Sequence, residues 1–159
     1  MILEPTSAGH DGSAVLVRKM TPADIPDVMP IEEESFLSPW TVDMMENELS
    51  VKNSHYLVAD EDGKILGFTG YWQVLDEGHI MNIAVKKDSR AKGIGSLLMD
   101  AMLEDGRKRG ILYWTLEVRV SNDPARRLYE KKQFELAGVR PGYYASPKED
   151  ACIYWRKDA

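Results

Sequence analysis

The sequence predicts a single α+β domain built around a mixed sheet. Three apolar runs follow one another with short turns between them, at residues 55–59, 65–72 and 79–85. Asp62-Gly63 is a strong β-hairpin signal, so these runs are expected to form an antiparallel meander. A fourth run, 112–118, follows the third after a helical pattern, and such a crossover places its two strands side by side and parallel.

Helices and further strands are expected around this core. Thr21 begins the first helix, because Thr21 can cap it, Pro22 suits its first position and Asp24 can complete a capping box. The other expected elements are a strand over 15–20, helices over 42–50, 94–109 and 123–132, and strands over 134–139 and 151–155. A loop that contains Tyr143 and Tyr144 is expected between the last two strands.

Length and composition define the class of protein. A chain of 159 residues suits one domain with its own core, so residues 14–159 are assigned to that domain and residues 1–13 to a flexible N-terminal segment. This segment is polar, with no secretory signal, and no apolar run approaches the roughly 20 residues of a membrane helix. The single cysteine, Cys152, excludes an intramolecular disulfide and fits a reducing cytoplasm.

The net charge limits the classes of binding partner that are expected. A formal net charge of −6 argues against a nucleic-acid binder and permits a basic peptide substrate, although such acidity also simply favours solubility. The three histidines and the cysteine show no metal-ligand spacing. The run Glu32-Glu33-Glu34 is expected to be a solvated helix face, and the alternative is a recognition surface for a positively charged N-terminus.

A glycine-rich turn joins the third strand of the meander to its following helix. It reads Arg90-Ala91-Lys92-Gly93-Ile94-Gly95-Ser96. The glycines allow the backbone to bend and a ligand to come close, and the free amides of a helix N-terminus favour negative charge. With the cations of Arg90 and Lys92 beside them, these groups suit a pyrophosphate. An ordinary strand-to-helix turn with solvated cations explains the glycine pair alone about as well.

Four segments together resemble a known family. The spacing Arg-x-x-Gly-x-Gly after a strand resembles the acetyl-CoA signature of the GNAT N-acetyltransferases. The other three segments are Asn82–Val85, Leu116–Asn122, and Leu128-Tyr129-Glu130 with Gln133-Phe134. Over about residues 15–155, the set is most similar to the RimI-type alanine N-acetyltransferases, which modify the N-terminus of a ribosomal protein. The resemblance implies a mostly antiparallel GNAT sheet whose one parallel strand pair forms the CoA cleft, and a cytoplasmic enzyme with acetyl-CoA as cosubstrate and no metal.

Two residues are candidates for acid–base chemistry. Glu117 is expected near the carboxyl end of a parallel strand, where ligands bind in open sheets. Alternation places it on the strand face of Tyr113 and Thr115, opposite the apolar Trp114 and Leu116. Partial burial would raise its pKa. Position alone favours a structural carboxylate paired with Arg119 or another cation, whereas the resemblance implies a general base. Tyr129 at helical spacing would ordinarily be a core residue, and the resemblance implies that its hydroxyl protonates the leaving CoA thiolate.

The resemblance also implies binding roles. The backbone of Ile83, Ala84 and Val85 would pair with the pantetheine arm, the segment Arg90–Ser96 would hold the pyrophosphate, and Asn122 would contact CoA in addition to capping its helix. Tyr143 and Tyr144 would wall the peptide-entry side, unless they merely close over the core.

The leading functional prediction is therefore acetylation of a protein α-amino group, with the N-terminal alanine of a small-subunit ribosomal protein as acceptor. The glycine loop would bind only CoA and carries no information about the acceptor. A lysine side chain or a small-molecule amine is therefore an alternative acceptor. A CoA-binding regulatory protein without turnover is a third possibility, which would need neither Glu117 nor Tyr129.

Overall fold

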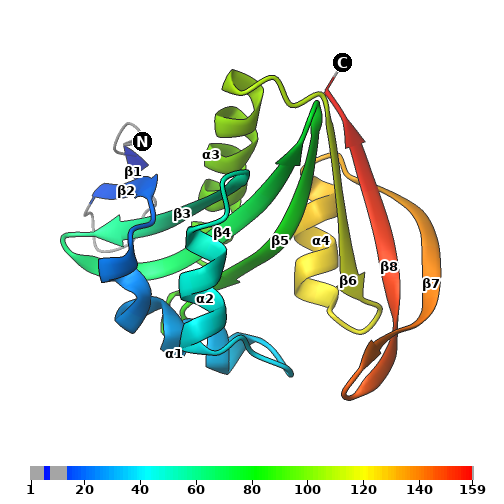
Figure 1. Ribbon diagram of the computed structural model, residues 1–159, viewed down its shortest axis with the longest axis horizontal. Coiled ribbons are helices and arrows are strands. Elements are labelled where there is room, and N and C mark those ends of the chain that lie inside the picture. The colour runs from blue at the N-terminus through cyan, green and yellow to red at the C-terminus, as the bar shows by residue number, and fades with distance from the viewer. Residues whose placement is uncertain (1–5, 8–13, 159) are drawn as a thin grey trace.

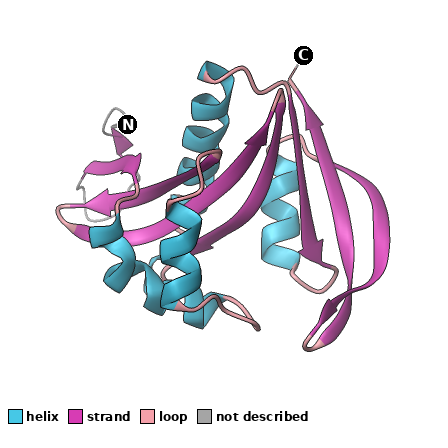
Figure 2. Cartoon of the chain, in the orientation of Figure 1, coloured by secondary structure: helices cyan, strands magenta, loops and turns pink. Residues whose placement is uncertain are grey.

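The computed structural model describes residues 6–7 and 14–158. In these residues eight strands form one sheet in the order β1-β2-β3-β4-β5-β6-β8-β7 (Figures 1 and 2). The strands are β1 Thr6–Ser7, β2 Ala14–Lys19, β3 Ser54–Glu61, β4 Lys64–Val74, β5 Glu77–Val85, β6 Tyr113–Arg119, β7 Glu135–Ala145 and β8 Lys148–Lys157. The helices are α1 Ile25–Ser35, α2 Val42–Leu49, α3 Ile94–Lys108 and α4 Asp123–Lys131, with short 3-10 turns at Pro22–Asp24 and Lys87–Ser89.

The predicted fold class is confirmed. Strands β3, β4 and β5 form the antiparallel meander, and β5 with β6 is the parallel pair in the described sheet. Most of the segment 1–13 lies outside the described residues, so its predicted flexibility stays a prediction. Within it, Thr6 and Ser7 pair with Val15 and Ala14 of β2.

Helices cover both faces of the sheet, and each face has its own core. On one face α3 and α4 pack over a cluster that contains Leu57, Trp114 and Tyr154. On the other face α1 and α2 pack over a second cluster that contains Val58 and Phe68. Leu57 and Val58 enter opposite cores because successive strand side chains point to opposite faces.

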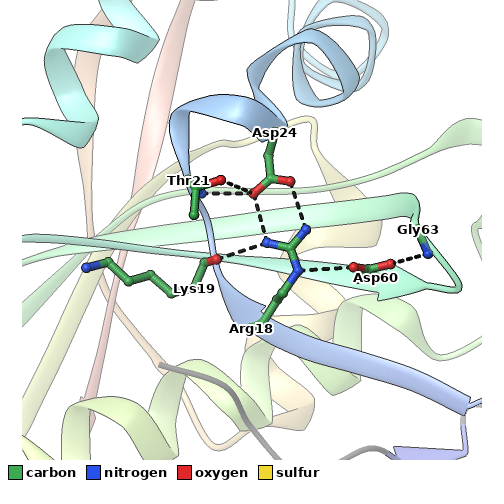
Figure 3. Close-up of polar contacts among 6 residues, drawn as sticks. All are labelled: Arg18, Lys19, Thr21, Asp24, Asp60 and Gly63. Carbon is green, nitrogen blue, oxygen red and sulfur yellow. Dashed lines mark hydrogen bonds and ion pairs between the residues drawn. The ribbon is translucent and has the colours of Figure 1, made fainter.

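A polar cluster around Arg18 ties the start of α1 to the sheet (Figure 3). The guanidinium of Arg18 donates two hydrogen bonds to Asp24, at 2.8 and 2.9 Å, and one to Asp60 of β3, at 3.0 Å. Asp24 also accepts the backbone N–H of Thr21 at 2.8 Å, as the predicted capping box requires. Asp60 accepts the N–H of Gly63 at 2.7 Å, which fixes the β3–β4 turn. We call Arg18, Asp24 and Asp60 the Arg18 cluster.

The loop expected around Tyr143 and Tyr144 is a strand instead. Strand β7 runs through both tyrosines to Ala145 and pairs with β8, with breaks in register after Leu136 and after Arg140. Pro141 falls in the second break, and β7 is an edge strand, where a residue without an N–H is tolerated. The sequence prediction was wrong because Pro141-Gly142 suggested a turn, whereas the structure accommodates the pair as an irregularity within the hairpin.

Candidate functional site

The parallel strands β5 and β6 pair only at one end. Their register joins Glu77 to Tyr113, Gly78 to Trp114 and His79 to Thr115, and beyond this point the strands diverge (Figure 1). A cleft of about 440 Å³ occupies the divergence. Its lining includes residues of β5, β6, α4, the end of α1 and the loop after it. Because the strands separate here, their facing backbone groups are available to a ligand.

Glu117 lies in this cleft and on the predicted face of β6. Burial alternates along the strand, which places Glu117 with Tyr113 and Thr115, opposite the buried Trp114, Leu116 and Val118. Its side chain is 12% exposed. Arg119 does not pair with Glu117; it forms an ion pair with Glu149 at 3.2 Å.

His79 is the partner of Glu117. The Nε2 atom of His79 lies 3.1 Å from Oε1 of Glu117, and the Tyr143 hydroxyl donates to the same oxygen at 3.2 Å. The hydrogen bond with His79 outweighs burial and lowers the pKa of Glu117 below its ordinary value. The expectation that burial would raise this pKa was wrong, because the sequence analysis did not foresee His79 beside the carboxylate.

Tyr129 also lines the cleft, from α4. Its ring lies between those of Phe134 and Tyr154, with centroids at 5.8 and 6.1 Å. Burial raises the pKa of the Tyr129 hydroxyl well above its ordinary value. Like any tyrosine hydroxyl it is protonated at neutral pH, and the raised pKa makes it a weaker acid than an ordinary tyrosine.

The glycine loop has the backbone form of an anion site. Ala91 and Gly93 both adopt left-handed conformations, with φ of 62° and 85°, and Gly93 caps the N-terminus of the 15-residue helix α3. A Cβ atom built on Gly93 would meet nothing within 4 Å, so open space faces the loop there. Left-handed residues beside a helix N-terminus gather N–H groups into a concavity that suits phosphate.

Arg90 has a different contact from the one expected. Its guanidinium donates to the Val85 carbonyl at 2.9 Å and to Oγ of Ser35 at 3.0 Å. In this structure Arg90 therefore fastens the glycine loop to β5 and α1. Lys92 is exposed, Ser96 is half-buried, and Ile94 is a core residue of α3.

The other predicted cofactor residues divide into two groups. Ile83 and Asn122 line the cleft, and Oδ1 of Asn122 also accepts the Ala125 N–H at 3.3 Å, as predicted for a helix cap. The Ala84 side chain enters the core under α1, and Val85 packs toward α3. Neither residue is on the lining of the cleft, and the role predicted for both uses only their backbone.

Tyr143 and Tyr144 stand on the β7 side of the cleft. Their rings meet edge to face, with centroids 5.0 Å apart. The guanidinium of Arg119 lies 4.2 Å from the Tyr144 ring centroid, and Tyr144 lines the cleft. This arrangement fixes an aromatic wall beside Glu117.

Glu32 corrects a prediction about the acidic run. Glu33 and Glu34 are exposed as expected, but Glu32 is 2% exposed and lines the cleft. The sequence held a signal for this, because Glu32 follows Val28 by four positions and therefore lies on the apolar face of α1. Asn82, which hydrogen-bonds to Glu32, was likewise missed as a site residue.

The described residues contain no group of three or more histidine, cysteine, aspartate or glutamate side chains placed to hold a metal ion. Among them, no helix has the length and apolar character needed to span a membrane.

The acetyltransferase (GNAT) family model matches residues 25–134, more than half of the chain. The chain belongs to the GNAT family. This confirms the resemblance seen in the sequence, and the named relatives identify the protein as an N-acetyltransferase.

Two relatives and one solved structure show how similar this GNAT enzyme is to known proteins. The Escherichia coli K12 ribosomal protein bS18 alanine N-acetyltransferase is 31% identical over 139 residues, which span 86% of this chain and 93% of that protein. A Bacillus subtilis protein to which the same activity is provisionally assigned is 42% identical over 141 residues, with 87% and 93% covered. The crystal structure of the E. coli ribosomal-protein-S18-alanine N-acetyltransferase superposes with a TM-score of 0.83 at 29% identity, covering 91% of this chain and 94% of that one.

Proposed function

We propose that this enzyme transfers the acetyl group of acetyl-CoA to the α-amino group of a protein, with the N-terminal alanine of a small-subunit ribosomal protein as acceptor and the cytoplasm as its compartment. The observation that carries this proposal is the cleft between β5 and β6, which has Glu117 and Tyr129 on its walls. The Bacillus subtilis and E. coli relatives, at 42% and 31% identity, supply the acceptor class.

The open end of the strand pair fits the cosubstrate. The backbone of Ile83, Ala84 and Val85 would bind the pantetheine arm, because β6 does not pair with β5 there. The amides of the segment Arg90–Ser96 would bind the pyrophosphate in the open space beside Gly93. Asn122 lines the cleft between β5 and β6 and would orient the bound molecule there. Acetyl-CoA supplies an activated acetyl thioester when it is bound.

Glu117 is proposed to remove the proton of the acceptor ammonium, directly or through a water molecule. Its lowered pKa keeps it ionised at neutral pH, so it is available as a base. His79 and Tyr143 both contact Oε1, which fixes the orientation of the carboxylate. The same contacts make Glu117 a weaker base than a free carboxylate, so catalysis depends on its placement.

Tyr129 is proposed to supply a proton to the departing thiolate. Its buried ring fixes the position of the protonated hydroxyl. The raised pKa makes the hydroxyl a weaker acid, so the proton transfer depends on this placement. Tyr143 and Tyr144 are proposed to guide the acceptor peptide, because they form the aromatic wall next to Glu117.

A competition experiment tests the proposal. The enzyme is incubated with acetyl-CoA and a short peptide that begins with alanine and contains one lysine, and the products are located by mass spectrometry. Matched peptides carry a block on the α-amine or on the lysine side chain. We expect acetylation of the free α-amine and loss of reaction when it is blocked.

Two other outcomes would replace the proposal. Preferred reaction of the α-blocked peptide would make the protein a lysine acetyltransferase. Binding of CoA without acetyl transfer to any peptide or small amine would leave a non-catalytic CoA-binding protein.

A further inference from the structure

The wall of the cleft formed by α1 contains a buried carboxylate. Oε2 of Glu32 accepts the backbone N–H of Trp40 at 2.9 Å, and Oε1 accepts Nδ2 of Asn82 at 3.3 Å. Glu32 and Asn82 both line the cleft that holds Glu117. Glu32 therefore connects strand β5 to the loop after α1.

Glu32 has no positively charged partner in the described part of the chain. No lysine, arginine or histidine among the described residues forms an ion pair with Glu32. Burial is the main influence on the carboxyl and raises its pKa. A buried carboxylate is costly unless a cation or enough hydrogen-bond donors compensate it, and here the two neutral donors do not offset the burial.

The titratable groups near Glu32 do not supply that charge. Tyr56 of β3 has its pKa raised by burial and by the carboxylates of Glu48 and Glu32, which are both acidic neighbours. Across the cleft lie Glu117, which is paired with His79, and Arg119, which is paired with Glu149. Among the described lining residues, Arg119 carries the one guanidinium, and it is already paired with Glu149.

Asn82 contributes an acceptor atom that is unused, next to the carboxylate of Glu32. Asn82 is 9% exposed, and its Nδ2 donates to Glu32. Its Oδ1 is buried and has no hydrogen-bond partner. A buried polar atom without a partner requires an explanation, and a ligand donor absent from the free protein is one.

We propose that Glu32 and Asn82 form the subsite that receives the charged α-amino group of the acceptor peptide. This inference rests on the proposed function and deepens it, because it names the group that the enzyme recognises. An ammonium offers a positive charge to Glu32 and N–H donors to the oxygens around it. The subsite would therefore select a free amino terminus and reject an acylated one.

A purely structural role predicts something different. If Glu32 only anchors the loop through Trp40, the carboxylate stabilises the free protein, and Glu32→Gln lowers the melting temperature at every pH. If Glu32 instead binds the ammonium of the peptide, its charge is uncompensated in the free protein. Glu32→Gln then removes a destabilising buried charge and raises the melting temperature at pH 8. This gain should shrink as the pH falls through the raised pKa, because Glu32 itself then becomes neutral.

Binding decides between these roles. A peptide that begins with alanine and its N-acetylated form are each titrated by calorimetry into the CoA-saturated protein. We expect the wild-type protein to bind the free-amino peptide at least about tenfold more tightly, and Glu32→Gln to reduce this ratio to near one. Glu33→Gln is the matched control, because Glu33 is exposed on the same helix and the charge change is the same. It should keep the wild-type ratio and melting temperature.

The outcomes separate the subsite from the catalytic proposal. An unchanged ratio in Glu32→Gln, no preference in the wild-type protein, or a lowered melting temperature at pH 8 would overturn the subsite. Acetyl transfer is assayed on the same samples. Preference for the free amine that depends on Glu32, without any transfer, would support the subsite and overturn the proposed function.

Discussion

Asp24 and Glu32 are buried carboxylates at opposite ends of one helical segment, and they have opposite surroundings. Asp24 belongs to the Arg18 cluster, where one guanidinium donates two hydrogen bonds to it (Figure 3). Its pKa is lowered chiefly by that contact. Glu32 has no such cation in the described part of the chain, and burial raises its pKa. Similar burial thus gives shifts of opposite sign, because only one of the two carboxylates is compensated within the protein.

The surroundings of Glu117 are intermediate between those of Asp24 and those of Glu32. Its pKa is lowered, as that of Asp24 is, but the partner is His79 and not a permanently charged arginine. The Arg18 cluster joins β2, β3 and the start of α1, whereas Glu117 faces the cleft. We infer that carboxylates compensated by a cation inside the protein hold the fold, and we propose that the carboxylates facing the cleft serve binding and chemistry.

The largest expected effect is at Glu117. Glu117→Gln keeps the shape of the side chain and removes the base, so kcat/KM should fall about 10²- to 10⁴-fold while acetyl-CoA affinity stays nearly unchanged. Steady-state kinetics and calorimetry with acetyl-CoA measure the two quantities. An equal loss of cosubstrate affinity would place Glu117 in binding instead of proton transfer.

A smaller effect, on stability alone, is expected at Asp24. Asp24→Asn should lower the free energy of unfolding by about 2–3 kcal/mol, since it breaks a largely buried charged pair. The folded-state pKa of Asp24 is lowered, so its contribution is present above the unfolded pKa of about 3.9 and is lost as the pH falls through the folded value. Urea unfolding at pH 7 and at pH 3 should show the difference from wild type shrinking at the lower pH.

Asp27→Asn is the matched control for that experiment. Asp27 is exposed in the first turn of the same helix and loses the same charge. It should change the free energy of unfolding by less than about 1 kcal/mol. Equal losses in the two variants would mean that the Arg18 cluster does not hold the fold.

The smallest expected effect concerns the glycine loop. Gly93→Ala places a Cβ in the open space proposed for phosphate and should weaken CoA binding about tenfold, or 1.4 kcal/mol. Gly110→Ala, after the other end of α3, is the control. Gly110 has φ of 87°, close to the 85° of Gly93, and equally open surroundings, so both changes carry the same backbone strain. Equal CoA affinities in the two variants would mean that this loop does not bind the pyrophosphate.

Local patterns in the sequence predicted most of the fold. Asp62-Gly63 marked the hairpin, Thr21 and Asp24 marked the start of α1, and strict alternation placed Glu117 on the less buried face of β6. These features depend on neighbouring residues, whose spacing the sequence displays directly.

The surroundings of the site could not be predicted in the same way. His79 reaches Glu117 through the register of two parallel strands, which a long crossover leaves undetermined in the sequence. The sign of the Glu117 pKa shift follows from that contact. Tyr143 contacts Glu117 from an irregular edge strand, and no local pattern distinguished that strand from a loop.

The pH dependence of two variants tests most directly whether the cleft residues perform proton transfer. Values of kcat/KM and kcat are measured across the accessible pH range for Glu117→Gln and Tyr129→Phe, with melting curves as the control for folding. The defect of Glu117→Gln should shrink as the pH rises, because more of the acceptor amine is already neutral. The defect of Tyr129→Phe should persist, because a higher pH cannot replace a missing proton donor. Parallel profiles with large losses of melting temperature would contradict the account and make both residues structural.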